Sequence, residues 1–234
     1  HLKFLGKYGD IVSFQQGFEA FKNNSISSPL ISFSFDDGYS GVGKYAKEIL
    51  QAYKAPGLVS ICNNFYKNKE VFWRNKLSYI HLNQGDRFLI SRLSKLGFNL
   101  NQDRISKFTL DHFNQDIINM INDVWGKFNI DEKEISKKIY LNKLELTNLI
   151  NDGWMIGNHS LNHFPIGEET QINNFINDFQ LNNDSILKSL DYESPFLTIP
   201  FDRILQRSLK IESLRSRAFK DKYIVYVGNK HNTG

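Results

Sequence analysis

The sequence of 234 residues predicts an α/β fold whose strands form a parallel sheet or barrel. Short apolar runs of strand length alternate with stretches in which apolar residues recur at helical spacing. The stretch 30–62 is the clearest case, because its strand–helix–strand order indicates a crossover between two parallel strands. Hydrophobic residues make up 41% of the chain, which is enough for a sizeable core. We therefore expect one large domain over residues 1–234.

The N-terminal part supplies the first complete strand–helix–strand unit. Residues 30–35 alternate apolar and small polar side chains, as a half-buried strand does, and the run ends at Asp-Asp-Gly. Pro56 and Gly57 end the following helix, and a continuous apolar run then indicates a buried strand. In chain order, the predicted elements are a strand at 11–14 within an otherwise helical segment 1–22, a strand at 30–35, a helix at 41–53 and a strand at 58–62.

The pattern changes over residues 66–138, where apolar residues recur at helical spacing among charged and Asn-rich connections. We expect a mostly helical insertion at about 66–138, between two strands of the barrel. The alternation of strands and helices then resumes. The predicted elements are a helix at 143–150, a strand at 154–157, a helix at 175–190, a strand at 195–199, a helix at 204–219 and a strand at 223–227.

Composition and charge exclude several classes of protein. The formal net charge of +4 is modest and the basic residues are scattered, so we expect no nucleic-acid partner. Cys62 is the only cysteine, which excludes an internal disulfide and a cysteine-based zinc cluster. No apolar run approaches the roughly 20 residues that span a bilayer, so we expect no transmembrane segment. The sequence does not indicate an oligomeric state.

The ends of the chain leave its compartment open. The first residue is His1 and no signal peptide is visible, but such a chain can be truncated at one or both ends. Both the cytoplasm and the cell envelope are therefore compatible with the sequence.

Two adjacent carboxylates, Asp36 and Asp37, stand at the end of the predicted strand 30–35. On an extended strand their side chains point to opposite faces, but a backbone turn at Gly38 lets both approach one cavity. One carboxylate can then bind a metal while the other accepts a proton. The alternative is an ordinary Asp-Gly turn with two solvated carboxylates.

Two imidazoles, His159 and His163, follow the predicted strand 154–157. Their spacing places both on one face if the segment forms a helical turn, which Ser160 can cap. The alternative is a polar surface loop with two incidental histidines, because His-x-x-x-His is a short pattern. The joint setting favours a site, since both motifs follow strands and the carboxyl ends of barrel strands form the active face.

Together the two motifs offer one carboxylate and two imidazoles, which is a three-ligand set for one divalent metal ion. By ligand type this set suits zinc, with cobalt, nickel or manganese as alternatives. The second carboxylate stands beside the ion and can take a proton from water. This chemistry is that of a metal-assisted hydrolase.

These residues resemble the motifs of the polysaccharide deacetylase family, the NodB-type domain of carbohydrate esterase family four. Residues 34–38 read Ser-Phe-Asp-Asp-Gly and are similar to the family's Thr-Phe-Asp-Asp-Gly. Residues 159–163 read His-Ser-Leu-Asn-His and match its His-Ser/Thr-x-x-His at every fixed position. The segments 1–22 and 144–156 resemble the family's approaches to these motifs. The resemblance covers most of the chain outside the insertion and implies a distorted (β/α)7 barrel.

The resemblance also implies a role for each residue. Asp36 is the expected general base that deprotonates a water activated by the metal, while Asp37, His159 and His163 hold the ion. Ser160 braces the histidine loop. The expected reaction removes N-acetyl groups from amino sugars of a glycan or glycolipid precursor and releases acetate. The expected partner is therefore a carbohydrate, either an N-acetylated glycan or a lipid-linked sugar.

The later motifs of the family are matched less fully. Residues 199–202 read Ile-Pro-Phe-Asp, where the third motif is Arg-x-Pro-Tyr/Phe-Gly. Pro200 and Phe201 fit, and the backbone N–H of Phe201 is the expected oxyanion donor. Thr198 stands at the position of the arginine. No final-motif histidine can be placed, and His231 is expected to be an uninvolved residue of the tail.

Two other functions are compatible with these motifs. The same metal site would serve a deformylase or another amide hydrolase. The other function is that of a catalytically weak family member, which binds glycan through the barrel mouth. The incomplete later motifs keep this alternative open. Tyr39 follows the first motif, where it either stacks on a sugar ring or packs around the barrel mouth.

Overall fold

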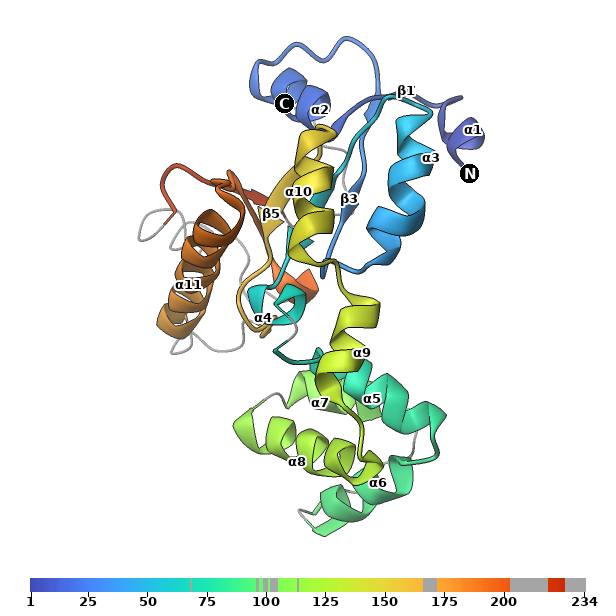
Figure 1. Ribbon diagram of the computed structural model, residues 1–234, viewed down its shortest axis with the longest axis vertical. Helices are drawn as coiled ribbons and strands as arrows, with labels where there is room; N and C mark the ends of the chain where they lie inside the picture. The colour runs from blue at the N-terminus through green and yellow to red at the C-terminus, as the bar shows by residue number, and fades with distance from the viewer. Residues whose placement is uncertain are drawn as a thin grey trace. The chain divides into compact units, whose positions relative to one another are not determined.

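The computed structural model describes residues 1–67, 69–95, 97–98, 101, 105–112, 114–165, 172–202 and 219–225 of the chain (Figure 1). The chain divides into two compact units. The first unit comprises His1–Lys67 and Lys137–Gly234, and the second comprises Asn68–Ser136.

Five parallel strands form the main sheet of the first unit, in the order β3-β4-β5-β6-β7. The sheet is curled into half of a barrel and accompanied by helices, which confirms the predicted distorted (β/α) barrel. All residues of β4 are fully buried, as the continuous apolar run indicates. The strands are β3 (Ser34–Phe35), β4 (Leu58–Ile61), β5 (Met155–Asn158), β6 (Phe196–Thr198) and β7 (Tyr223–Val225).

A separate pair of parallel strands, β1 (Asp10–Ile11) and β2 (Leu30–Ile31), lies outside this sheet. The predicted strand 30–35 is therefore two strands, because its first residues pair with β1 and its last residues pair with β4. The predicted strand 11–14 is also shorter than expected. Ser13 instead caps α2 (Phe14–Lys22), accepting a hydrogen bond from the backbone N–H of Gln16.

Helices pack against the main sheet and enclose the core of the first unit (Figure 1). α10 (Lys143–Asn151) contacts β5 and η1 (Val42–Ala46), and α11 (Ile172–Leu190) contacts β5 and α4 (Asn63–Tyr66). The remaining helical segments of this unit are α1 (Leu2–Leu5), α3 (Lys47–Gln51) and η5 (Pro200–Asp202). One core cluster includes Val59, Ile61, Leu146, Leu149, Trp154 and Ile156, and a second includes Phe175, Phe179, Leu197 and Ile199.

The described residues of the second unit form helices and their connections, with no strand among them. Its buried face carries apolar side chains at helical spacing, such as Ile117, Ile121 and Val124. The elements are α5 (Trp73–Leu82), α6 (Asp86–Lys95), α7 (Ile105–Asp111), α8 (Gln115–Trp125), η3 (Gly126–Phe128) and the beginning of α9 (Glu132–Ile139). In the parts of both units that the structure describes, no helix has the length and apolar character needed to cross a membrane.

The predicted elements at the C-terminal end are covered only in part. β7 begins at Tyr223, as expected from the sequence, and is described to Val225. The predicted helix 204–219 lies almost wholly outside the described residues. His231 also lies outside them.

Candidate metal centre

The parallel ladder brings the two sequence motifs to one edge of the sheet. Phe35 pairs with Val59, and Val59 pairs with Ile156, so β3 and β5 flank β4 in register. Asp36 and Asp37 follow β3, and His159 directly follows β5. Because the carboxyl ends of parallel strands share an edge, residues more than 120 positions apart meet there.

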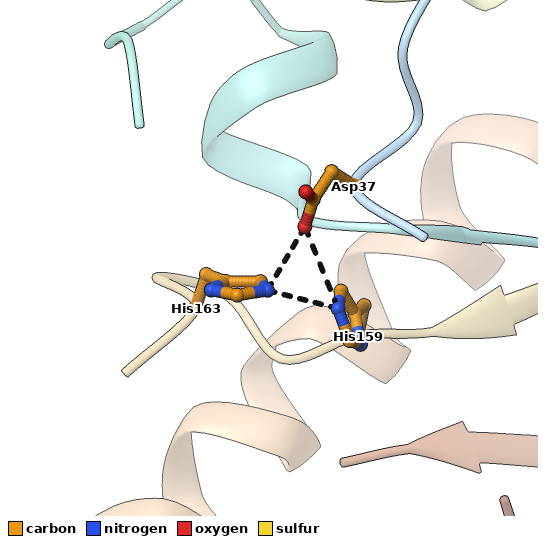
Figure 2. Close-up of side chains that lie close together, drawn as sticks. All are labelled: Asp37, His159 and His163. Carbon is orange, nitrogen blue, oxygen red and sulfur yellow. Dashed lines mark hydrogen bonds and ion pairs between the residues drawn. The ribbon is translucent and has the colours of Figure 1, made fainter. Parts of the chain in front are cut away.

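Asp37, His159 and His163 point toward one another (Figure 2). The Nε2 atom of His163 lies 2.9 Å from Oδ1 of Asp37, and Nε2 of His159 lies 3.5 Å from the same oxygen. The two Nε2 atoms are 2.9 Å apart. Both histidines are buried, and the Asp37 side chain is 17% exposed. The structure thus brings together the three ligands that the sequence predicts.

The second ring nitrogen of His159 determines which atom of the imidazole is available as a ligand. Nδ1 lies 2.9 Å from the backbone carbonyl oxygen of Thr198. A carbonyl can only accept a hydrogen bond, so Nδ1 carries the proton. Nε2 therefore presents a lone pair toward Asp37 and His163. Metal-binding histidines are commonly oriented in this way, by a hydrogen bond from the other ring nitrogen to a backbone carbonyl.

The pKa values of the three groups follow from burial and from their mutual contacts. Burial alone would raise the pKa of Asp37, but its contacts with the two imidazoles outweigh burial and hold the pKa well below its usual range. Burial lowers the pKa of His163, and the neighbouring charge of His159 lowers it further. For His159, burial also favours the neutral form, but Asp37 and the charge of Asp36 raise its pKa overall.

The donor set fits a divalent metal ion. Oδ1 of Asp37 is buried and receives no hydrogen bond, although two ring nitrogens lie within ion-pair distance. The ligand atoms of the three residues all lie within 4.8 Å of one another, close enough to hold one ion. Two nitrogen lone pairs at this separation repel each other unless a cation or a proton lies between them. One carboxylate oxygen and two imidazole nitrogens are the ligands of many catalytic zinc sites.

Four of the nine described non-glycine residues with positive φ lie at this centre. Asp37, Ser160, His163 and Phe201 have φ angles of 67°, 66°, 55° and 61°. These values lie in the left-handed region, which non-glycine residues seldom adopt. Such conformations persist where the surrounding structure determines them, and they cluster at functional sites.

The two predicted residues adjacent to the ligands lie where the sequence motifs place them. Asp36 is exposed, and its charge is among the causes that raise the pKa of the buried His159. Ser160 is fully buried, and its hydroxyl oxygen accepts a hydrogen bond of 2.9 Å from the backbone N–H of His163. This bond closes the turn between the two histidines.

The predicted substrate residues occupy two different environments. The ring of Phe201 packs edge-on against His163, with centroids 4.7 Å apart, and Pro200 precedes it as a buried residue. The ring of Tyr39 stacks on Tyr140 with centroids 5.7 Å apart. Phe201 is thus in contact with a candidate ligand, whereas Tyr39 packs against the ring of Tyr140.

Comparisons with solved structures reveal the same fold in bacterial enzymes. A de-N-acetylase from Aggregatibacter actinomycetemcomitans superposes with a TM-score of 0.57 at 13% identity, covering 96% of this chain and 74% of that one. This chain has the fold of the de-N-acetylases. IcaB from Ammonifex degensii gives a TM-score of 0.53 at 12% identity, with 93% and 70% covered.

The deacetylase PplD from Streptococcus pyogenes, solved with acetate, gives a TM-score of 0.52 at 12% identity. The match covers 90% of this chain and 62% of that deacetylase. No family model matches the sequence, and no curated protein matches it. The likeness to the de-N-acetylases therefore lies in the fold, at a sequence identity of 13% or less.

Several residues of this de-N-acetylase fold support the centre but are not predicted from the sequence. Asp178 and Asn182, both on α11, bond to the segments that carry the ligands. Their spacing of four residues places them on one face of the helix, together with the buried Phe175, Phe179 and Ile186. Polar residues on an otherwise apolar helix face are the sequence signal that identifies them.

Proposed function

We propose that this chain is a metal-dependent hydrolase that removes N-acetyl groups from amino sugars of a glycan or a lipid-linked sugar. The observation that carries the proposal is the convergence of Asp37, His159 and His163 at the carboxyl edge of the sheet. The fold shared with de-N-acetylases supports the choice of reaction.

The three converging residues hold the ion, which we take to be zinc because of the two imidazole ligands. When bound, a divalent ion supplies a Lewis acid that polarises an acetyl carbonyl and makes water more acidic. In the neutral imidazole, the hydrogen bond from Nδ1 of His159 to Thr198 leaves Nε2 as the nitrogen that carries the lone pair. Burial of both imidazoles excludes bulk water from the ligand side of the centre.

Asp36 is the proposed general base, since its exposed carboxylate faces solvent beside the buried ligands. It accepts the proton of the attacking water, whose oxygen bonds to the acetyl carbon. The backbone N–H of Phe201 is the proposed donor to the oxygen that gains negative charge, and Pro200 helps to fix the turn that presents it. The carbon–nitrogen bond then breaks as the nitrogen takes up the proton that Asp36 accepted, which gives acetate and a free amine.

A second candidate is a protein that binds N-acetylated glycan with little turnover. Thr198 favours it, because this residue stands where the deacetylase motif has arginine and instead bonds to His159. A deformylase or another amide hydrolase would use the same ligands and differ in the acyl group that is released.

Metal analysis and product analysis test the proposal together. Purified protein is expected to contain about one equivalent of divalent ion. His159→Ala and His163→Ala should each lose it, and full occupancy in both variants would refute the ligand assignment. Asp36→Asn should keep the metal but lose turnover, measured as acetate released from N-acetylglucosamine oligomers. Saturable glycan binding without acetate favours the binding protein, and formate release from N-formyl analogues favours the deformylase.

A further inference from the structure

The loop between the two histidines wraps around a single carboxylate of α11. Oδ2 of Asp178 accepts hydrogen bonds from the backbone N–H groups of Leu161 and Asn162, at 2.9 and 3.1 Å. Its Oδ1 accepts another from the side-chain amide of Asn162. Two of the three residues between the histidines therefore bond to Asp178.

Ser160 belongs to the same loop and contacts the second candidate ligand directly. Its hydroxyl oxygen accepts the hydrogen bond from the backbone N–H of His163. Ser160 and His163 are both in the left-handed region, at φ of 66° and 55°. Such a backbone needs support from outside the loop, and Asp178 supplies it from a helix that packs on β5.

We infer that Asp178 is the positioning residue of the histidine pair, holding His163 at the distance from His159 that binding one ion requires. The inference deepens the proposed function and rests on the metal role of the two histidines. Asp178 itself is not one of the converging ligands. Its carboxylate accepts three hydrogen bonds from Leu161 and Asn162, so it acts on the centre through the loop that carries the histidines.

The Asp178 carboxylate is partly buried, and removing its charge from water has a cost in stability. A positioning role for Asp178 is consistent with this cost being tolerated. Burial raises the pKa of Asp178 even though hydrogen bonds from Asn162 and Leu161 favour its charged form. A carboxylate in such a place is unfavourable for stability by itself. The backbone N–H groups of Leu161 and Asn162 offset this cost, because both donate hydrogen bonds to the carboxylate of Asp178.

Asp178→Asn tests the inference, with Asp184→Asn as the matched control because Asp184 is exposed on the same helix. The full chain is stripped of metal and titrated with zinc against a chromophoric chelator. Asp178→Asn is expected to weaken zinc binding roughly 10- to 100-fold, and Asp184→Asn less than about twofold. Amide exchange at His163 should accelerate in Asp178→Asn alone.

A second variant and a double variant keep the test decisive. If Asp178→Asn does not fold, Asp178→Glu retains the charge and displaces its oxygens by one methylene, and it should weaken binding in the same direction. Combining Ser160→Ala with Asp178→Asn should cost less affinity than the sum of the two changes, because both act along one path.

The outcomes separate this inference from the proposed function. If the unchanged protein binds no zinc, the proposed function fails. If it binds zinc and folded Asp178→Asn binds it equally well, the positioning role is overturned and the metal centre stands. Accelerated amide exchange with unchanged affinity would also overturn it, since Asp178 would then support the loop without setting the ligand geometry.

Discussion

The Nδ1 atom of His159 lies 2.9 Å from the carbonyl oxygen of Thr198 and 2.8 Å from the hydroxyl oxygen of the same residue. One residue thus offers two acceptors to a single N–H, and both stand at the end of β6. The backbone acceptor does not depend on the side chain. The tautomer of His159 is therefore a property of the fold more than of the threonine.

Thr198→Val is accordingly expected to preserve the tautomer and to weaken metal binding only modestly. Losing one of two acceptors costs about 1 kcal/mol, or roughly fivefold in affinity. Nitrogen NMR of the imidazoles should show a protonated Nδ1 in both proteins before metal is added. A switch to the Nε2–H tautomer in Thr198→Val would show that the hydroxyl of Thr198, and not its carbonyl, determines the tautomer of His159.

Metal affinity is expected to fall as the pH is lowered, and His159 is the group responsible. Contacts with Asp37 and the charge of Asp36 outweigh burial and raise the pKa of His159, so a proton competes with the ion for Nε2. Asp37 stays ionised because its pKa is lowered, and His163 stays neutral because burial lowers its pKa.

Below the raised pKa of His159, each pH unit should weaken binding roughly tenfold, because one proton is displaced per ion. The metal affinity is measured from about pH 5.5 to about pH 8.5 by competition with a chelator whose own pH dependence is known. An affinity that does not change over this range would show that no ligand proton is displaced.

The ligands could be predicted from the sequence because each motif is local and each follows a strand. Asp37 comes two residues after β3, and His159 comes directly after β5, so the parallel order alone brings them to one edge. The split of the predicted strand 30–35 into β2 and β3 could not be predicted. An alternating pattern shows which residues are extended and not which partner each one pairs with.

The supporting residues could not be assigned from the sequence because their partners are distant in the chain. Asn182 bonds to Ile61, 121 positions away, and Asp178 bonds to Leu161, 17 positions away. Only the packing of α11 on β5 brings these groups together. Thr198 could be placed by its motif position, but its contact with His159 depends on the pairing of β5 with β6.

Gly38→Ala is expected to destabilise the first unit by about 1–3 kcal/mol. Gly38 has φ of 67°, and an added Cβ would lie 3.0 Å from Cγ2 of Ile61. Both effects strain the turn that presents Asp36 and Asp37. Urea unfolding of the metal-free protein measures the loss, and Gly41→Ala is the control, since its Cβ would only touch Tyr45 at 3.9 Å. Equal stability of the two variants would contradict the prediction.

Asn182→Ala is expected to cost about 2–4 kcal/mol of unfolding free energy, because it breaks a buried network. The Asn182 side chain is fully buried and donates to the carbonyl of Ile61 and to Oδ1 of Asn158, at 2.9 and 2.7 Å. It also accepts from the backbone N–H of Asn63 at 2.8 Å. All three partners lose a bond in the variant.

The control for this change is Asn177→Ala, an exposed position on the same helix. It should change stability by less than about 0.5 kcal/mol. Both variants are unfolded in urea and followed by circular dichroism. A loss for Asn182→Ala no larger than that of the control would mean that water replaces the missing bonds.

Glu132→Ala is expected to destabilise the second unit, because it leaves a buried lysine charge without its carboxylate. Nζ of Lys76 lies 2.8 Å from Oε1 of Glu132 and 2.9 Å from Oδ1 of Asn122, and the lysine side chain is 6% exposed. The same Glu132 oxygen accepts the backbone N–H of Val71 at 2.6 Å. Removing one partner of a fully buried pair costs 3–5 kcal/mol, and we expect about 2 kcal/mol because Glu132 is 28% exposed.

The double variant Lys76→Met and Glu132→Gln separates charge from packing. It removes both charges and keeps a long side chain at each position, so it should be more stable than Glu132→Ala. Lys133→Ala, exposed on the same helix, should leave stability within about 0.5 kcal/mol. Thermal unfolding of the full chain measures all three. If Glu132→Ala and the double variant unfold at the same temperature, removing the unpaired charge of Lys76 restores no stability, and the prediction is contradicted.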